Sequence, residues 1–195
     1  MNIAFFDFDG TITRGDSFAL FLRFVLGKRF YIKVAQNIPT LLAYKLGMVD
    51  NSCTKEKILH SCFKGMSESV LQERCFAFRE TLESFCKASA LEKMQWHKQQ
   101  GHKIVLVSAS FEEYLRPLCM HWGIDILATT MAVENGILTG KFSQPNCYGI
   151  EKEKRIKACY DLKQYEYIYV YGDTRGDKEM LALASPNLAF FRVFD

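Results

Sequence analysis

Three short apolar segments, each followed at once by polar residues, constrain the fold of this chain more than any other feature. They cover residues 2–8, 102–108 and 167–172, and each is too short to be a typical helix. Short continuous apolar runs are typical of strands buried on both faces of a parallel sheet. A fourth strand is predicted at 188–194. Helical patterns separate the strands, so the sequence predicts an α/β fold with helices on both faces of the sheet.

Turn and cap signals refine this prediction. Ser110 and Glu113 have the spacing of a capping box, which predicts that a helix starts there and runs to about Trp122. Further helices are predicted at 152–162 and 178–184. Residues 131–142 are different, because the pair Asn135-Gly136 lies between strand-like residues and predicts a hairpin with a type I′ turn.

The regular alternation is interrupted between residues 17 and 88. This stretch carries several helical patterns and no convincing strand. We therefore expect a helical cap domain at 17–88, inserted after the first strand. The core domain is expected to comprise 1–16 and 89–195.

Composition excludes several classes of protein. The net charge is only +3, which argues against nucleic acid as the main partner. The seven cysteines form no C-x-x-C pair, so neither a structural zinc site nor a disulfide framework is predicted, and a reducing compartment is favoured. The first residues do not resemble a signal peptide, and no apolar run approaches the ~18 residues of a spanning helix. These features predict a cytoplasmic protein.

Polar clusters follow three of the predicted strands. Because the carboxyl ends of parallel strands meet at one edge of the sheet, where such sheets bind ligands, we expect the clusters to lie together. Four carboxylates at one edge repel each other unless a cation is present, and oxygen ligands without histidine or cysteine suit Mg²⁺. The clusters are Asp7–Thr11, Ser108–Ser110 and Gly172–Asp177, and Lys152 opens a helix before the last of them.

A carboxylate is also a competent nucleophile towards phosphorus. A hydroxyl and an ammonium group beside a metal ion can hold phosphoryl oxygens and offset the developing charge. Each cluster by itself has a simpler explanation: Asp9-Gly10 as a turn, the serines as helix caps, Lys152 as a solvated side chain. Together, in this order and each after a predicted strand, they predict phosphoryl transfer to an aspartate followed by hydrolysis.

The motifs that carry these residues resemble those of the haloacid dehalogenase superfamily, in particular the subgroup that contains phosphoserine phosphatase. The matching segments are FFDFDGTIT (5–13), VLVSAS (105–110), CYGIEK (147–152) and YGDTRGDKEML (171–181). The resemblance implies a Rossmann-like parallel-sheet core, a helical cap inserted after the first strand, and Mg²⁺ as cofactor.

The resemblance also implies a role for each matching residue. Asp7 is the expected nucleophile and a metal ligand, and Asp9 the general acid and base, with its main-chain carbonyl on the metal. Ser108 and Lys152 are expected to bind the phosphoryl group, with Lys152 matching the family spacing better than Lys154. The remaining expected residues are Thr11, which orders the motif loop at the phosphate site, and the metal ligands Asp173 and Asp177. Dehalogenation is disfavoured because Asp9 is present.

The substrate is less constrained. In phosphoserine phosphatase a glutamate shortly after the first motif binds the substrate amine, and the matching position here is the shorter Asp16. Asp16 is therefore a candidate substrate residue on the cap side, or alternatively the N-cap of a helix that begins near Ser17.

The segment 17–49 leaves a second question open. It contains no acidic residue and five basic ones among many aromatic and aliphatic residues. This pattern is typical of a helix at an anionic lipid surface, and it is similar to the same region of bacterial phosphatidylglycerophosphatases. It is also typical of an amphipathic cap helix packed on a core, which is the commoner case.

Several functions remain compatible with the sequence. The leading hypothesis is hydrolysis of a small phosphorylated metabolite. The alternatives are hydrolysis of a lipid phosphate with peripheral membrane contact through 17–49, phosphotransfer to an alcohol, and a catalytically silent binding module. The sequence does not determine the substrate or the oligomeric state.

Overall fold

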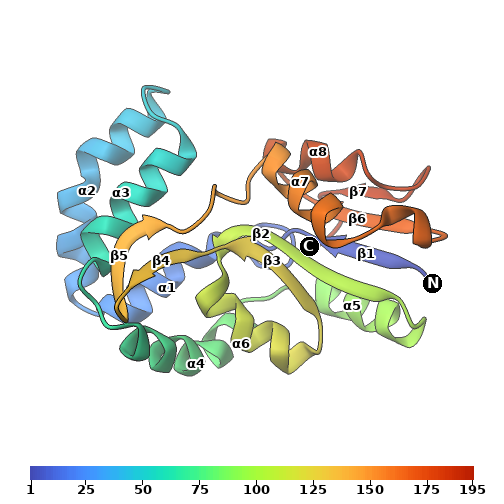
Figure 1. The fold of residues 1–195 in the computed structure, drawn as a ribbon, viewed down its shortest axis with the longest axis horizontal. Coiled ribbons are helices and arrows are strands. Elements are labelled where there is room, and N and C mark those ends of the chain that lie inside the picture. Colours follow the sequence, from blue (N-terminus) through green and yellow to red (C-terminus); the bar gives the residue numbers. More distant parts are fainter.

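A five-stranded parallel sheet forms the centre of the molecule in the computed structural model, which describes all residues 1–195 (Figure 1). The strand order is β3-β2-β1-β6-β7. The strands are β1 (Ile3–Phe6), β2 (Lys103–Phe111), β3 (Asp125–Thr129), β6 (Ile168–Gly172) and β7 (Ala189–Phe191). The predicted α/β class and the four predicted strands are confirmed, whereas β3 was not recognised in the sequence.

The central strand β1 is buried on both faces, as its apolar sequence predicts. All four of its residues are fully buried. Because side chains alternate along a strand, Ile3 and Phe5 pack into one apolar cluster and Ala4 and Phe6 into another, on opposite faces of the sheet. Parallel pairing of β1 with both β2 and β6 fixes the position of the loop that follows Phe6.

Four helices surround the sheet: α5 (Ala88–Gln99), α6 (Glu112–Trp122), α7 (Ile150–Cys159) and the short α8 (Lys178–Leu181). Two 3-10 turns accompany them, η1 (Leu162–Gln164) and η2 (Arg175–Asp177). Helix α6 ends at Trp122, as predicted, because Gly123 adopts a left-handed conformation with φ +65°.

The predicted capping box at the start of α6 is wrong. The helix begins one residue later than expected, after Phe111, and no side chain caps it. The Ser110 hydroxyl instead donates to Asp9, and Glu113 Oε1 accepts from the main-chain N–H of Met131 at 2.7 Å. Both side chains are therefore used in tertiary contacts, which a local sequence pattern does not reveal.

Residues 17–84 form four helices without a strand: α1 (Ser17–Leu26), α2 (Arg29–Lys45), α3 (Asn51–Phe63) and α4 (Glu68–Ser84). Figure 1 shows α2 and α3 projecting at one end of the molecule, at the opposite end from α7 and α8. None of the helices combines the length and the apolar character that crossing a bilayer would require.

The predicted hairpin is confirmed as β4 (Met131–Glu134) and β5 (Ile137–Phe142). Asn135 and Gly136 have φ of +51° and +75°, as a type I′ turn requires. The hairpin bonds to the segment between α3 and α4: Gly65 N–H donates to Leu138 O, and Leu138 N–H to Met66 O, both at 2.9 Å. It thus packs with the helices of residues 17–84, although it lies within the segment predicted for the core.

Candidate active site

The loop after β1 places Asp7 at the carboxyl edge of the sheet. The main-chain N–H of Asp7 donates to Tyr171 O on β6 at 2.9 Å, so the position of Asp7 is set by the sheet itself. Its side chain is almost buried, with 6% of the residue exposed. The first and last predicted clusters therefore meet where the parallel topology requires.

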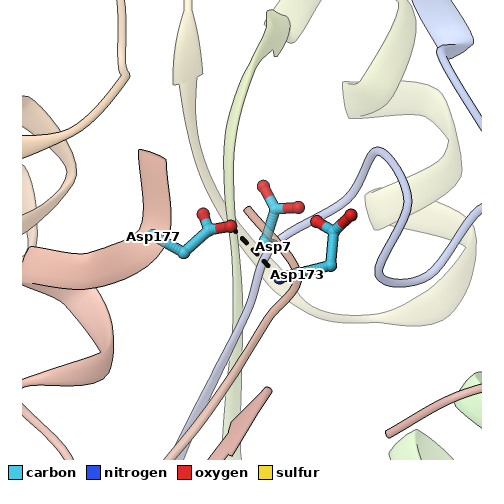
Figure 2. Close-up of side chains that lie close together, drawn as sticks. All are labelled: Asp7, Asp173 and Asp177. Carbon is cyan, nitrogen blue, oxygen red and sulfur yellow. Dashed lines mark hydrogen bonds between the residues drawn. The ribbon is translucent and has the colours of Figure 1, made fainter. Parts of the chain in front are cut away.

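Three carboxylates converge at this edge. Oxygen atoms of Asp7, Asp173 and Asp177 lie within 4.8 Å of one another (Figure 2). Gly10 makes the close approach of Asp173 to the motif loop feasible, because a Cβ at Gly10 would lie 2.2 Å from Asp173 Oδ2. Gly10 also has φ +80°, a conformation that other residues rarely adopt.

Lys152 on α7 neutralises part of this charge. Its buried ammonium group donates to Asp7 Oδ1 and, at 2.7 Å, to Asp177 Oδ1. One of its three N–H donors has no acceptor in the protein. Lys154, the alternative lysine, is exposed on the same helix.

Asp177 is held in place mainly by the loop that contains it. Its Oδ2 accepts from the main-chain N–H of Asp173 at 3.2 Å, and from the N–H and hydroxyl of Thr174 at 2.9 and 3.0 Å. Thr174 and Asp177 form a capping box around η2. Thr11 connects the other two carboxylates, since its hydroxyl lies 3.1 Å from Asp7 Oδ2 and 3.2 Å from Asp173 Oδ1.

Burial and charge shift the pKa values of this group in different directions. Burial raises the pKa of Asp7 to about 7, with a further rise from Asp177 and a decrease from Lys152. Burial opposes the charged form of Lys152, but its two carboxylate partners outweigh that effect and raise its pKa. Lys152 and Thr174 together lower the pKa of Asp177 despite its burial. Lys152 is thus charged at neutral pH, and a further cation would favour the ionised form of Asp7.

The chemistry of these donors fits Mg²⁺. The three converging carboxylates supply hard oxygen atoms, and the main-chain carbonyl of Asp9 accepts no hydrogen bond from the protein. No histidine or cysteine belongs to the cluster. Such a donor set suits a hard divalent cation rather than zinc.

Asp9 is bonded to α1 and β2 rather than to the other carboxylates. Its Oδ1 accepts from the main-chain N–H of Ser17 at 2.7 Å, and its Oδ2 accepts from the Ser110 hydroxyl. Burial raises the pKa of Asp9, the charge of Asp16 adds to the rise, and the bonds from Ser110 and Ser17 oppose it. Two donated hydrogen bonds therefore hold a carboxyl group whose pKa burial keeps above its usual value.

Ser108 lies within β2 and lines the same cleft as Asp7. The residue is buried, and its Oγ accepts from the main-chain N–H of Ser110 at 3.0 Å. Its own hydroxyl hydrogen has no acceptor in the protein and is available to a ligand. Ser110 differs, because its hydroxyl is already bonded to Asp9.

A cleft of about 310 Å³ opens above these side chains. It brings together Asp7, Asp9, Ser108, Lys152 and Asp177 with residues of α3. Asp173 and Thr11 do not line it. Its full lining is Asp7, Asp9, Gly10, Gly15, Asp16, Asn51, Lys55, Ser108, Ala109, Tyr148, Lys152, Thr174 and Asp177.

Asp16 contributes to the cleft and caps α1. Its Oδ1 accepts from the main-chain N–H groups of Phe18 and Ala19 at 2.8 and 3.1 Å, which confirms the N-cap interpretation. Its Oδ2 accepts no hydrogen bond from the protein and remains available on the cap side of the cleft.

Lys55 is a cleft residue that the sequence analysis missed. It reaches from α3 to donate to Ala109 O at 2.9 Å, directly after Ser108. Burial lowers its pKa, while Asp9 and Asp16 oppose that shift. No motif contains Lys55, and it resembles any other basic residue of a cap helix until the fold brings it to the core.

Comparison with known proteins identifies the family to which this site belongs. Residues 4–182 match the family model of haloacid dehalogenase-like hydrolases. The chain belongs to this family of hydrolases, as its motifs predicted.

Two sequence relatives span most of the chain. Protein CicA of Caulobacter vibrioides is 31% identical over 192 residues, which cover 97% of this chain and 85% of the relative. A Mycobacterium tuberculosis protein named "probable phosphatase" is 30% identical over 190 residues, which cover 91% of this chain and 64% of the relative.

Solved structures confirm the fold. A Bordetella pertussis protein of unknown function superposes with a TM-score of 0.80 at 20% identity, over 96% of this chain and 92% of that one. A phospho-aspartyl intermediate analogue of phosphoserine phosphatase superposes with a TM-score of 0.67 at 16% identity, over 94% and 83% of the two chains.

Proposed function

We propose that this protein hydrolyses a phosphate monoester in a Mg²⁺-dependent reaction, with Asp7 as the nucleophile. The observation that carries the proposal is the placement of Asp7, which is buried at the floor of the cleft, paired with Lys152 and clustered with Asp173 and Asp177. A carboxylate so placed can attack phosphorus while neighbouring cations balance the phosphoryl charge.

In the first step, one Asp7 oxygen attacks phosphorus in line with the leaving oxygen, and an aspartyl phosphate forms. The third N–H of Lys152 and the free hydroxyl hydrogen of Ser108 bind phosphoryl oxygens. Protonated Asp9 gives its proton to the leaving alkoxide, a role for which its raised pKa is suited. Thr11 keeps Asp7 oriented through its hydroxyl.

In the second step, Asp9 acts as a base. Asp9 has given its proton to the leaving group and is now a carboxylate. This carboxylate removes a proton from water as the water attacks the phosphorus of the aspartyl phosphate. The bonds from Ser17 and Ser110 hold the same carboxyl group in place through both steps. Phosphate leaves and Asp7 is regenerated.

Mg²⁺ would supply charge stabilisation for the phosphoryl oxygens when it is bound. Asp7, Asp173, Asp177 and the main-chain carbonyl of Asp9 are the groups that would hold it. Asp173 is the least enclosed of the three carboxylates, and Thr11 is its hydrogen-bond partner across the loop.

The substrate that this cleft favours is a small phosphorylated molecule. Asp16 and Lys55 provide one acidic and one basic group on the cap side, so they are candidates to bind polar parts of the substrate. Because Asp16 is shorter than glutamate and already caps α1, we do not assign phosphoserine as the substrate.

A second candidate is the same chemistry on a lipid phosphate. The observation that favours it is the outer face of α2, where Tyr31, Ile32 and Leu42 are 64%, 59% and 54% exposed on a helix without acidic residues. Exposed apolar side chains beside basic ones are typical of contact with an anionic lipid surface. This candidate predicts salt-sensitive pelleting of the protein with anionic vesicles.

The decisive assay uses p-nitrophenyl phosphate with Mg²⁺ or with EDTA. We expect Mg²⁺-dependent release of p-nitrophenol by the wild type, and a loss of at least ~10³-fold in Asp7→Asn, because the amide is not a nucleophile. Asp161→Asn makes the same change at an exposed position and serves as the matched control. Turnover that survives in freshly prepared Asp7→Asn, without deamidation, contradicts the proposal.

A further inference from the structure

A second cavity lies between the first three cap helices. It has a volume of about 170 Å³ and a mostly apolar wall. Side chains of all three helices contribute, including Phe18, Leu22, Leu26, Val34, Leu41 and Ile58. At about 30 Å³ for each water-sized group, the cavity has room for roughly six such groups.

This cavity adjoins the active-site cleft. Asp16 lines both spaces, and Phe18 and Ala19, whose main-chain N–H groups Asp16 caps, line the apolar one. A molecule whose phosphate lies at Asp7 can therefore extend past Asp16 along the first turn of α1. The surroundings of such a molecule would change from polar in the cleft to apolar in the cavity.

The wall of the cavity suits an apolar ligand. Its amide residue, Asn37, is already engaged, since Nδ2 donates to Lys33 O at 2.8 Å and to Ser61 Oγ at 3.1 Å. The apolar side chains that line this space do not pack against one another across it. An apolar chain that entered it would make contact with these side chains and leave water.

We propose that this cavity binds the apolar chain of the substrate. The substrate class is then a phosphate monoester that carries an unbranched alkyl or acyl chain. The cavity encloses about six carbons of that chain, beyond the part that crosses the cleft past Asp16. This inference rests on the proposed function of the Asp7 site. It selects chain-bearing esters among the small phosphorylated molecules that the cleft accommodates.

The first test is a series of alkyl phosphates from ethyl to decyl, all kept below their aggregation limits. We expect kcat/KM to rise about three- to four-fold for each methylene that enters the cavity, the value for complete burial, and then to level off once the cavity is full. A flat series, with turnover that still depends on Asp7, overturns the chain subsite and leaves the proposed function intact.

A filling variant locates the effect. Ala19→Phe places a ring in the cavity and is expected to abolish the dependence on chain length. Ala35→Phe adds the same ring to an exposed position on α2 that does not line the cavity, and the dependence should persist there. Suppose instead that Ala19→Phe raises the melting temperature but leaves the dependence of kcat/KM on chain length unchanged. The ring would then fill the cavity without displacing the substrate chain, so the cavity would be only a packing defect and the proposal would be overturned.

A binding measurement separates this inference from catalysis. Alkylphosphonates have a C–P bond in place of the ester and are not hydrolysed, so calorimetry on the wild type reports binding alone. A Kd that falls with chain length supports the subsite even if no ester is turned over. The absence of turnover would contradict the proposed function, but not the subsite. A Kd independent of chain length overturns the subsite, whatever the activity.

Discussion

The carboxyl edge of the sheet and the outer helix α2 differ in how many of their side chains have a packing or hydrogen-bond partner within the protein. At the edge, Asp7, Lys152 and Asp177 are buried, and each is hydrogen-bonded to another residue of the site. On α2, Asn37 is the one buried residue, and most of the apolar side chains face outwards.

This difference indicates what each region depends on. The edge is an internally paired group of charges, so removing one partner leaves the others buried without compensation. The outer face of α2 has few internal partners to lose, so changes there should affect contacts with other molecules more than stability. Substitutions in the two regions should therefore have opposite consequences.

The largest effect is expected from Lys152→Met, which leaves two buried carboxylates without their cation. The free energy of unfolding in EDTA should fall by about 3–5 kcal/mol, because the loss of one partner from a buried ion pair is strongly destabilising. Chemical denaturation measures the change. Lys154→Met, at an exposed position of the same helix, should stay within ~0.5 kcal/mol of the wild type. Equal stability of the two variants would contradict the pairing.

A smaller effect on stability, with a marked effect on catalysis, is expected from Gly10→Ala. The new Cβ would meet Asp173 Oδ2, and the φ of +80° would be strained. Displacement of this carboxylate by about 1 Å should lower kcat by ~10²-fold. Gly27→Ala is the control, because its φ of +53° is also strained but nothing lies within 4 Å of the added carbon. A similar kcat for both variants would show that backbone strain, and not the displacement of Asp173, causes the loss of activity.

A moderate effect is expected from Lys55→Met, which removes the bond from α3 to Ala109 O. Loss of a hydrogen bond made by a charged donor in the cleft should raise KM about ten-fold, with a smaller change in kcat. Steady-state kinetics of Lys57→Met, an exposed lysine of the same helix, provide the comparison. An unchanged KM in Lys55→Met would show that this lysine does not contribute to substrate binding.

The smallest effect on the fold is expected from Ile38→Glu on the outer face of α2. Stability should remain within ~0.5 kcal/mol, because the side chain is exposed. Binding to anionic vesicles should weaken by about ten-fold or more, through loss of apolar contact and addition of a negative charge. Gln36→Glu adds the same charge without removing an apolar group. Equal vesicle binding by both variants would show that the apolar side chain contributes nothing and that only electrostatic attraction acts at this surface.

The sequence predicts the edge of the sheet well because the relevant signals are local. Buried strands are visible as apolar runs, and parallel topology brings their carboxyl ends together, so Asp7, Ser108 and Asp173 could be placed without a structure. Asn135-Gly136 was predictable for a similar reason, since few residues accept two successive positive φ angles.

Other features depend on contacts between distant segments. Ser110 and Glu113 match a helix-capping pattern, but the fold turns them towards Asp9 and Met131. Lys55 gains its place from the packing of α3 against the end of β2. Strand β3 was missed because its central residues, Ile126 and Leu127, form too short an apolar run to recognise.

The most direct test of the central claim is to trap the covalent intermediate. Protein mixed rapidly with substrate and Mg²⁺, quenched in acid and digested, should yield a phosphorylated peptide whose modified residue is Asp7. Borohydride reduction of the acyl phosphate should convert that residue to homoserine. A phosphoryl group found only on another residue, or turnover with no adduct under single-turnover conditions, would contradict nucleophilic catalysis by Asp7.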